Sequence, residues 1–387
     1  MGKIGKKMIV GSMLTIIYLL LFIYFNAPLP AKEWFITIPA FTIIYFLIFN
    51  MGKPEIVDEV NNANIIAGNR VLIFPFIILL VIHYYIFAHG ETPFSGTAAL
   101  LPFLFAFPIL YYRAFPRTDI GRVDYLVLLV FLVPLTLIDI QGDTNLPIKG
   151  KGFGSIFKIS WILLMVYVFG HIRKLKDIGF YPMFKLKFLG IALLSWLSFL
   201  SFVMLIAFFL GFVNPDPFLE IRQDGFMKSL QELMRIFIGT ALFEEVFFRG
   251  LLQNMLAKQI EKSGNWKKYW VNGFIILLVL SAWAGYALEL NLIWFPVAIA
   301  IGLFVPAYFL EQKQYQAMGT YTALAIIAMS FGLAHYHKGS IIFVGLAAVA
   351  GWAYGYTYLK TKNVFYAALV HTLVNFSEFL FKLHEIK

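Results

Sequence analysis

Long runs of apolar residues recur along the whole chain and restrict its fold more than any other feature. A helix crosses a bilayer with about 17 to 25 mostly apolar residues, and thirteen runs approach that length: near 8–25, 34–49, 71–87, 97–112, 123–139, 155–170, 189–213, 235–257, 271–288, 291–309, 320–336, 340–359 and 364–381. With 60% hydrophobic and 13% charged residues, the chain cannot give a soluble globule a polar surface. The sequence therefore predicts an all-α fold, a polytopic transmembrane helical bundle of about 11–14 spans.

The formal net charge of +10 is spread over short loops between these runs. If the N-terminus is cytoplasmic, alternate loops carry most of the Lys and Arg residues, as the positive-inside rule predicts. A nucleic-acid-binding protein would gather such charge on one arm or face, so we expect no nucleic-acid partner. We expect an integral, multi-pass protein of a bacterial cell membrane, in contact with membrane lipids.

The chemistry open to the chain is limited by its composition and by the length of its loops. It has no cysteine, which excludes disulfides, thiolate metal ligands and cysteine nucleophiles. The polar stretches are too short for a soluble domain. Any catalysis would therefore take place in or at the bilayer, with Glu, Asp, His, Ser or a metal held by oxygen and nitrogen.

Polar side chains divide the chain into two regions. In residues 1–213 they lie chiefly at loop positions; Lys158 is the main exception, and we expect it to reach the interface from a span end. Residues 214–387 instead carry ionisable and amide side chains within apolar runs. The sequence predicts an N-terminal transmembrane region of unassigned role, 1–213, followed by a second domain, 214–387.

The stretch ALFEEVFFRG, residues 241–250, places two carboxylates and a guanidinium in an apolar run. A charge at mid-bilayer costs about 2.5–3.5 kcal/mol and persists when it is paired. On an α-helix, Glu245 and Arg249 have the i, i+4 spacing and order that favour an ion pair. Glu244 points about 100° away from this pair, which makes its carboxylate the candidate general base.

Two further motifs bring imidazole and amide groups into apolar runs. FGLAHYHKG ends one run with His335, and HTLVN places His371 and Asn375 one helical turn apart. Together with Glu244 they could activate water and stabilise an oxyanion. A metal site made of Glu244, His335 and His371 is the alternative, with a divalent ion such as zinc. The residues require no cofactor and leave both possibilities open.

The same polar residues also have interpretations outside catalysis. Glu245 and Arg249 could form a bridge that only joins helices, and His335 could make an ordinary interhelical hydrogen bond. Intramembrane ionisable residues also mark transport pathways. A multi-span transporter and a non-catalytic membrane partner are therefore the alternatives to an enzyme.

Three motifs follow one another in the second domain: Glu244-Glu245-x-x-x-Arg249, Phe331-x-x-x-His335 and His371-x-x-x-Asn375. With the flanks FFRGLLQ and FGLAHYHKG, they resemble the CPBP family of intramembrane proteases. This family includes the type II CAAX prenyl endopeptidases and the Abi proteins linked to bacteriocin self-immunity. The resemblance covers about residues 215–381 and implies a CPBP-type helical core in the C-terminal half.

The resemblance also implies an activity, an intramembrane endopeptidase, either glutamate-dependent or a metalloprotease. Its substrate would be a peptide or protein, for which a lipid-modified CAAX-type C-terminus and a bacteriocin-immunity-like target are both family precedents. The implied roles are these: Glu244 and His335 activate water, His371 and Asn375 stabilise the oxyanion, and Glu245 and Arg249 give structural support.

One spacing departs from the family pattern. His335 follows Arg249 by 86 positions, which is longer than the resemblance implies. We expect an inserted helical hairpin near 271–309 to occupy this interval.

Overall fold

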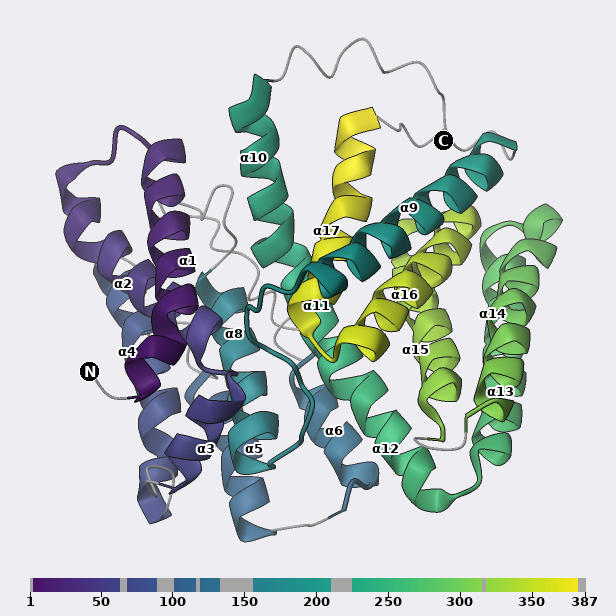
Figure 1. Ribbon diagram of the computed structural model, residues 1–387, viewed down its shortest axis with the longest axis horizontal. Coiled ribbons are helices and arrows are strands. Elements are labelled where there is room, and N and C mark those ends of the chain that lie inside the picture. The colour runs from purple at the N-terminus through teal and green to yellow at the C-terminus, as the bar shows by residue number, and fades with distance from the viewer. Residues whose placement is uncertain are drawn as a thin grey trace. The chain divides into compact units, whose positions relative to one another are not determined.

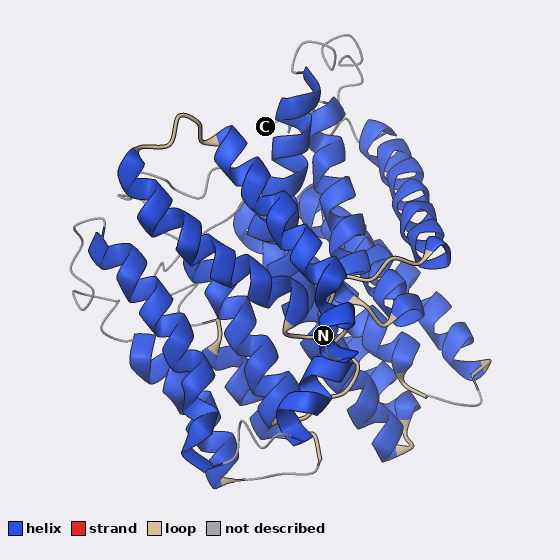
Figure 2. Cartoon of the chain, turned by 60° about the vertical axis from the view of Figure 1, so that its left-hand side comes forward, coloured by secondary structure: helices blue, strands red, loops and turns tan. Residues whose placement is uncertain are grey.

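The computed structural model describes residues 3–62, 68–88, 101–115, 119–132, 156–209, 225–314 and 318–381. Within these residues the regular elements are helices and no strand occurs (Figures 1 and 2). Each apolar run named above coincides with helix in its described part. The prediction of an all-α helical bundle is therefore confirmed.

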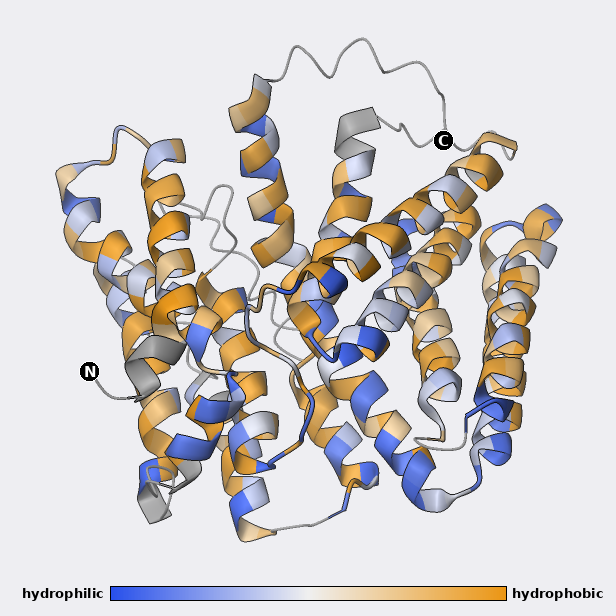
Figure 3. Cartoon of the chain, in the orientation of Figure 1, coloured by the Kyte–Doolittle hydropathy of each residue, from blue (hydrophilic) through white to orange (hydrophobic). Residues whose placement is uncertain are grey.

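Six described helices contain segments long and apolar enough to cross a membrane: Met8–Phe25, Ala31–Asn50, Leu186–Ile206, Trp266–Leu288, Leu290–Gln312 and Ile341–Thr361. Three shorter apolar helices accompany them: Arg70–Tyr85, Ile156–Ile172 and Val364–Ser377. Hydrophobic residues cover most of the helices in Figure 3, whereas hydrophilic residues gather at connections such as the one between α12 and α13. The runs near 97–112 and 123–139 lie partly outside the described residues, so the number of spans stays a prediction.

The chain forms two compact units. The first unit comprises Met1–Met183 and Leu230–Val246, and the second comprises Phe184–Ser229 and Phe247–Lys387. The stretch that carries both glutamates belongs to the first unit, and the division into domains 1–213 and 214–387 stays a prediction.

The first unit is built from apolar helices that pack through aromatic side chains. Its helices are α1 (Lys3–Phe25), α2 (Ala31–Asn50), α3 (Pro54–Asn62), α4 (Ile73–Ala88), α5 (Leu101–Ala114), α6 (Arg122–Val130), α8 (Ile156–Val166) and α11 (Leu242–Glu245). The Phe22 ring on α1 stacks on the Phe41 ring on α2 at 4.7 Å, and Phe41 also meets Tyr85 on α4. In addition, α8 packs against α2, α4 and α11. These contacts place α8 beside the helix that carries Glu244 and Glu245.

A buried ion pair joins further parts of the first unit. Arg173 Nε donates to Asp124 Oδ1 at 2.7 Å, and the Tyr112 hydroxyl donates to the same oxygen at 2.8 Å. The Gly121 N–H donates to the other carboxylate oxygen at 2.8 Å. Asp124 therefore has hydrogen bonds on both oxygens, which offsets the cost of burying its charge.

The second unit packs helices closely around α15 and α16. Its helices are α9 (Leu186–Phe209), α12 (Asn254–Ser263), α13 (Trp266–Leu288), α14 (Trp294–Gln312), α15 (Thr320–Ala334), α16 (Ile341–Thr361) and α17 (Val364–Phe381), while the residues of α10 (Gly225–Ile236) are divided between the units. A Cβ added to Gly332 on α15 would lie 2.5 Å from the Val344 carbonyl oxygen on α16. Small residues let the two backbones approach, as is common between membrane helices.

Consecutive helices α13 and α14 pack against each other and against α15. The buried Glu311 carboxylate, at the end of α14, accepts hydrogen bonds from the backbone N–H groups of Gly319 and Thr322 at the start of α15. A carboxylate is stabilised at the N-terminus of a helix, which is the positive end of the helix dipole. Glu311 therefore fixes the end of α14 to the beginning of α15 and, through it, to the close α15–α16 contact.

Candidate active site

The segment with both glutamates and Arg249 is not a regular α-helix. Between α10 and α12 the chain forms a π-helical turn, Phe237–Ala241, the short α11, and a second π-helical stretch, Val246–Gln253. In a π-helix the backbone bonds run to the fifth residue, and such turns are frequent at functional sites. Glu245 and Arg249 are therefore not related by four residues of regular α-helix, the geometry on which the predicted ion pair depends.

In the first unit the two glutamates differ in exposure. Glu245 is fully buried, whereas Glu244 is half-buried. The burial difference parallels the predicted division, in which Glu245 is structural and Glu244 reacts. That division is a prediction from the motif, and the exposures are compatible with it.

Lys158 is a further charged residue near the glutamates, and it was not among the predicted site residues. Its ammonium Nζ on α8 lies 5.4 Å from the centroid of the Phe243 ring, and the lysine interacts electrostatically with Glu244. The expectation that Lys158 only reaches for the interface is therefore incomplete. No local sequence signal could have revealed the contact, since it joins segments far apart in the chain.

In the second unit Arg249 is enclosed by aromatic rings. Its side chain is fully buried, and the guanidinium carbon lies 4.8 Å from the Phe331 ring centroid and 5.6 Å from those of Phe248 and Tyr354. Guanidinium groups within about 6 Å of a ring face are attracted by its quadrupole. Phe331 belongs to α15 and Tyr354 to α16, so both helices hold the Arg249 side chain in place.

His335 stands where α15 ends and a short 3-10 turn begins. Its Nδ1 lies 2.8 Å from the Phe331 carbonyl oxygen, and its ring centroid lies 4.7 Å from that of Phe331. When Nδ1 carries the proton it donates to this carbonyl, and Nε2 is then the acceptor nitrogen. In that tautomer the half-buried ring presents Nε2 as an acceptor.

His371 on α17 is buried and packs against the same aromatic group. Its ring stacks on Tyr354 with a centroid separation of 4.5 Å and an interplanar angle of 11°. The Phe331 ring meets His371 edge-on at 5.9 Å. Asn375 follows one turn later on α17 and is half-buried.

Phe331 and Tyr354 thus connect members of all three motifs within the second unit. Phe331 contacts Arg249, His335 and His371, and Tyr354 contacts Arg249 and His371. The motifs had identified Phe331, but Tyr354 lies in the aromatic run WAYGYTY, where nothing distinguishes it from its neighbours.

The three motifs also lie within the part of the chain that is similar to known proteins. Residues 227–318 and 308–377 match the family model for Type II CAAX prenyl endopeptidase Rce1-like proteins. This part of the chain is similar to Rce1-like proteins. No curated protein and no solved structure matches the chain.

The match confirms the resemblance that the three motifs had indicated. An Rce1-like region supports a CAAX-type protease in general, and the apolar helices place it in a membrane. Most of the first unit lies outside the match, including α8 with Lys158.

The sequence also predicted, as an alternative, a metal site of Glu244, His335 and His371. Across the residues that the structure describes, no three His, Cys, Asp or Glu side chains form a group that could hold a metal ion. Because Glu244 belongs to the first unit and both histidines belong to the second, this three-ligand site stays a prediction, and no reaction step is derived through a metal.

Proposed function

We propose that the chain is an intramembrane endopeptidase that hydrolyses a peptide bond with water activated by Glu244 and His335. The observation that carries this proposal is the convergence in the second unit, where Phe331 and Tyr354 pack against Arg249, His335 and His371. The Rce1-like match supports the same class of enzyme. Replacement of Glu244 by Gln tests the proposal.

The proposed reaction needs two proton transfers. Glu244 removes a proton from a water molecule that His335 orients, while the water oxygen adds to the scissile carbonyl carbon. His371 and Asn375 donate hydrogen bonds to the oxyanion that forms. The carbon–nitrogen bond then breaks, and the proton held by Glu244 passes to the leaving amine. Glu245 and Arg249 support this arrangement without touching the reacting atoms.

This mechanism predicts that cleavage continues without a divalent metal. After dialysis against EDTA, the purified protein should cleave a peptide reporter at its original rate, because Glu244 and His335 activate water directly. The measurement compares initial rates before dialysis, after it, and after zinc is restored. A loss of activity that zinc reverses would contradict the metal-free mechanism and leave the protease assignment in place.

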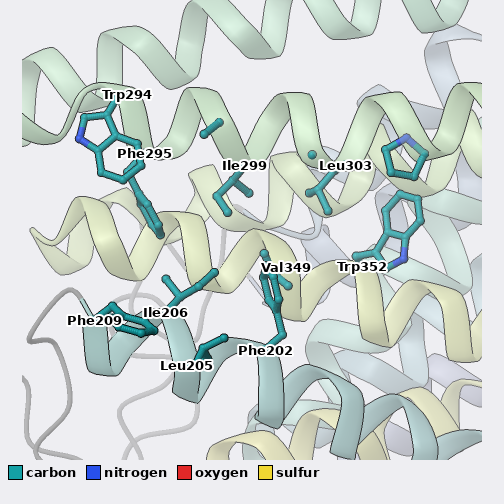
Figure 4. Close-up of a pocket in the computed structure, with 13 residues that line it drawn as sticks. Phe202, Leu205, Ile206, Phe209, Trp294, Phe295, Ile299, Leu303, Val349 and Trp352 are labelled. Carbon is teal, nitrogen blue, oxygen red and sulfur yellow. The ribbon is translucent and has the colours of Figure 1, made fainter.

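An apolar pocket in the second unit bears on the substrate. It has a volume of about 580 Å³ and lies between α9, α14 and α16 (Figure 4). Its labelled residues are all hydrophobic: Phe202, Leu205, Ile206, Phe209, Trp294, Phe295, Ile299, Leu303, Val349 and Trp352. Ligand pockets usually have volumes of roughly 300–1,000 Å³. We propose that this pocket receives the hydrocarbon part of a lipid-modified substrate, as a CAAX-type activity would require.

Gly302 offers a direct test of the pocket. It lines the pocket, and a Cβ added there would meet no atom within 4 Å. Gly302→Leu should therefore fold, and its side chain should fill part of the pocket. The prenyl chain would then bury about two CH₂ groups fewer, which should raise KM for a prenylated peptide about tenfold. The measurement is steady-state cleavage of prenylated and unmodified forms of one peptide.

Gly190→Leu is the matched control for this experiment. Gly190 lies on α9, outside the pocket lining, and also has open space around an added Cβ. It should leave both KM values unchanged. Equal losses on the two peptides in Gly302→Leu would show that the pocket does not select the hydrocarbon chain.

A further inference from the structure

Lys158 lies on a helix whose surroundings are apolar. In α8, with the sequence IFKISWILLMV, it is the one charged residue, and Ile156, Ile159, Ser160 and Trp161 around it are buried. An intramembrane ammonium group is costly and persists when an opposite charge or a functional role compensates for it. A reason for this lysine should therefore be found in the elements that pack against α8.

The helix with the two glutamates is such an element. Within the first unit, α8 packs against α11 and the π-helical turn Phe237–Ala241 before it. Lys158 Nζ lies 5.4 Å from the Phe243 ring centroid, and Phe243 immediately precedes Glu244. The lysine is thus held at the point where α11 presents its first carboxylate.

The charges at this contact are few and complementary. The turn Phe237–Ala241 has no titratable side chain, and α11 contributes Glu244 and Glu245. From α8 the facing charge is Lys158, which interacts electrostatically with Glu244. On the glutamates' own helical run the next charged residue is Arg249, in the second π-helical stretch. Lys158 is thus the cation that α8 contributes at this contact.

We propose that Lys158 is a positioning residue, whose ammonium group orients the Glu244 carboxylate for proton abstraction. The inference rests on the proposed function of Glu244. It goes beyond the Rce1-like region, because α8 lies outside the matched residues. The N-terminal part of the chain, which had no assigned role, then completes the environment of the general base.

The test is cleavage by Lys158→Met, which keeps the length of the side chain and removes its charge. Without the ammonium, Glu244 loses the group that orients it, and a misplaced catalytic group slows the chemical step. We expect kcat to fall about tenfold with KM unchanged, because the lysine acts on Glu244 and not on substrate binding.

Lys158→Arg is the conservative control. It keeps a cation and should restore most of the wild-type kcat. A wild-type kcat in Lys158→Met would overturn the inference, as would a loss in Lys158→Arg equal to that in Lys158→Met. If Glu244→Gln is inactive while Lys158→Met behaves as wild type, only the inference fails. If Glu244→Gln retains full activity, the proposed function fails and the inference fails with it.

A stability measurement covers the case in which Lys158→Met does not fold. Removing one partner of a buried ion pair leaves an unbalanced charge, whereas removing both relieves it. The double variant Lys158→Met/Glu244→Gln should then recover folded protein, judged by size-exclusion chromatography and Tm. Failure of the double variant to fold better than Lys158→Met would overturn the pairing.

Discussion

We expect Glu244→Gln to insert and fold like the wild type but to cleave its substrate about 10²- to 10⁴-fold more slowly, the usual contribution of a general base. Gln has the size of Glu but does not accept a proton near neutral pH. Because of this equal size, the substitution at the half-buried Glu244 should leave no cavity. The experiment compares membrane peptides from cells that express each protein at matched levels.

Glu261→Gln is the control for this comparison. Glu261 is an exposed carboxylate on α12, which follows in the same helical run. It should leave the cleavage products unchanged. Products that appear only with the wild type and Glu261→Gln would identify the substrate, whereas full activity of Glu244→Gln would reject the proposed function.

The largest structural effect is expected from Gly332→Leu. A Cβ at Gly332 would lie 2.5 Å from the Val344 carbonyl oxygen, 2.6 Å from the Ala348 Cβ and 2.9 Å from the Ala348 nitrogen. The two backbone atoms cannot move aside as a long side chain could, and the Ala348 Cβ is fixed to its backbone, so α15 and α16 must separate. Overpacking typically costs about 1–3 kcal/mol and occasionally more, a large part of the roughly 5–15 kcal/mol that stabilises a folded protein.

The measurement for Gly332→Leu is the folded fraction after extraction, by size-exclusion chromatography, together with Tm. We expect loss of monodisperse protein or a Tm well below that of the wild type. Gly190→Leu adds the same side chain in open space on α9 and should keep the wild-type Tm. An unchanged Tm in Gly332→Leu would show that α15 and α16 pack less closely than these distances indicate.

The helices could be predicted because one physical effect decides them. Apolar runs partition into the bilayer and must satisfy their backbone groups internally, so the runs that end near Phe25, Leu288 and Phe381 become helices without reference to packing. The π-helical stretch Val246–Gln253 could not be predicted in this way. Its side chains are those of any apolar helix, and the wider turn depends on tertiary contacts.

The candidate site was predicted in part for a similar reason. Motif spacing identified Arg249, His335 and His371, which the structure brings together around Phe331. Tyr354, stacked on His371, and Lys158, beside Phe243, are set by pairings between distant helices. A sequence pattern reports neighbours along one helix, whereas these contacts depend on which helices meet. The catalytic roles of Glu244, His335, His371 and Asn375 stay predictions, as do the supporting roles of Glu245 and Arg249.

The π-helical stretch Val246–Gln253 determines which way α12 faces. One residue more in a regular α-helix would turn everything downstream by about 100° around the axis. A π-helical turn takes up an extra residue in a wider turn and so keeps the downstream side chains on their face. Gln253 Nε2 donates to the Gly355 carbonyl oxygen on α16 at 3.1 Å, a contact that depends on this face. The chain can therefore gain or lose one residue in this stretch, with the helix changing between π and α turns, and still present the same side chains to α16.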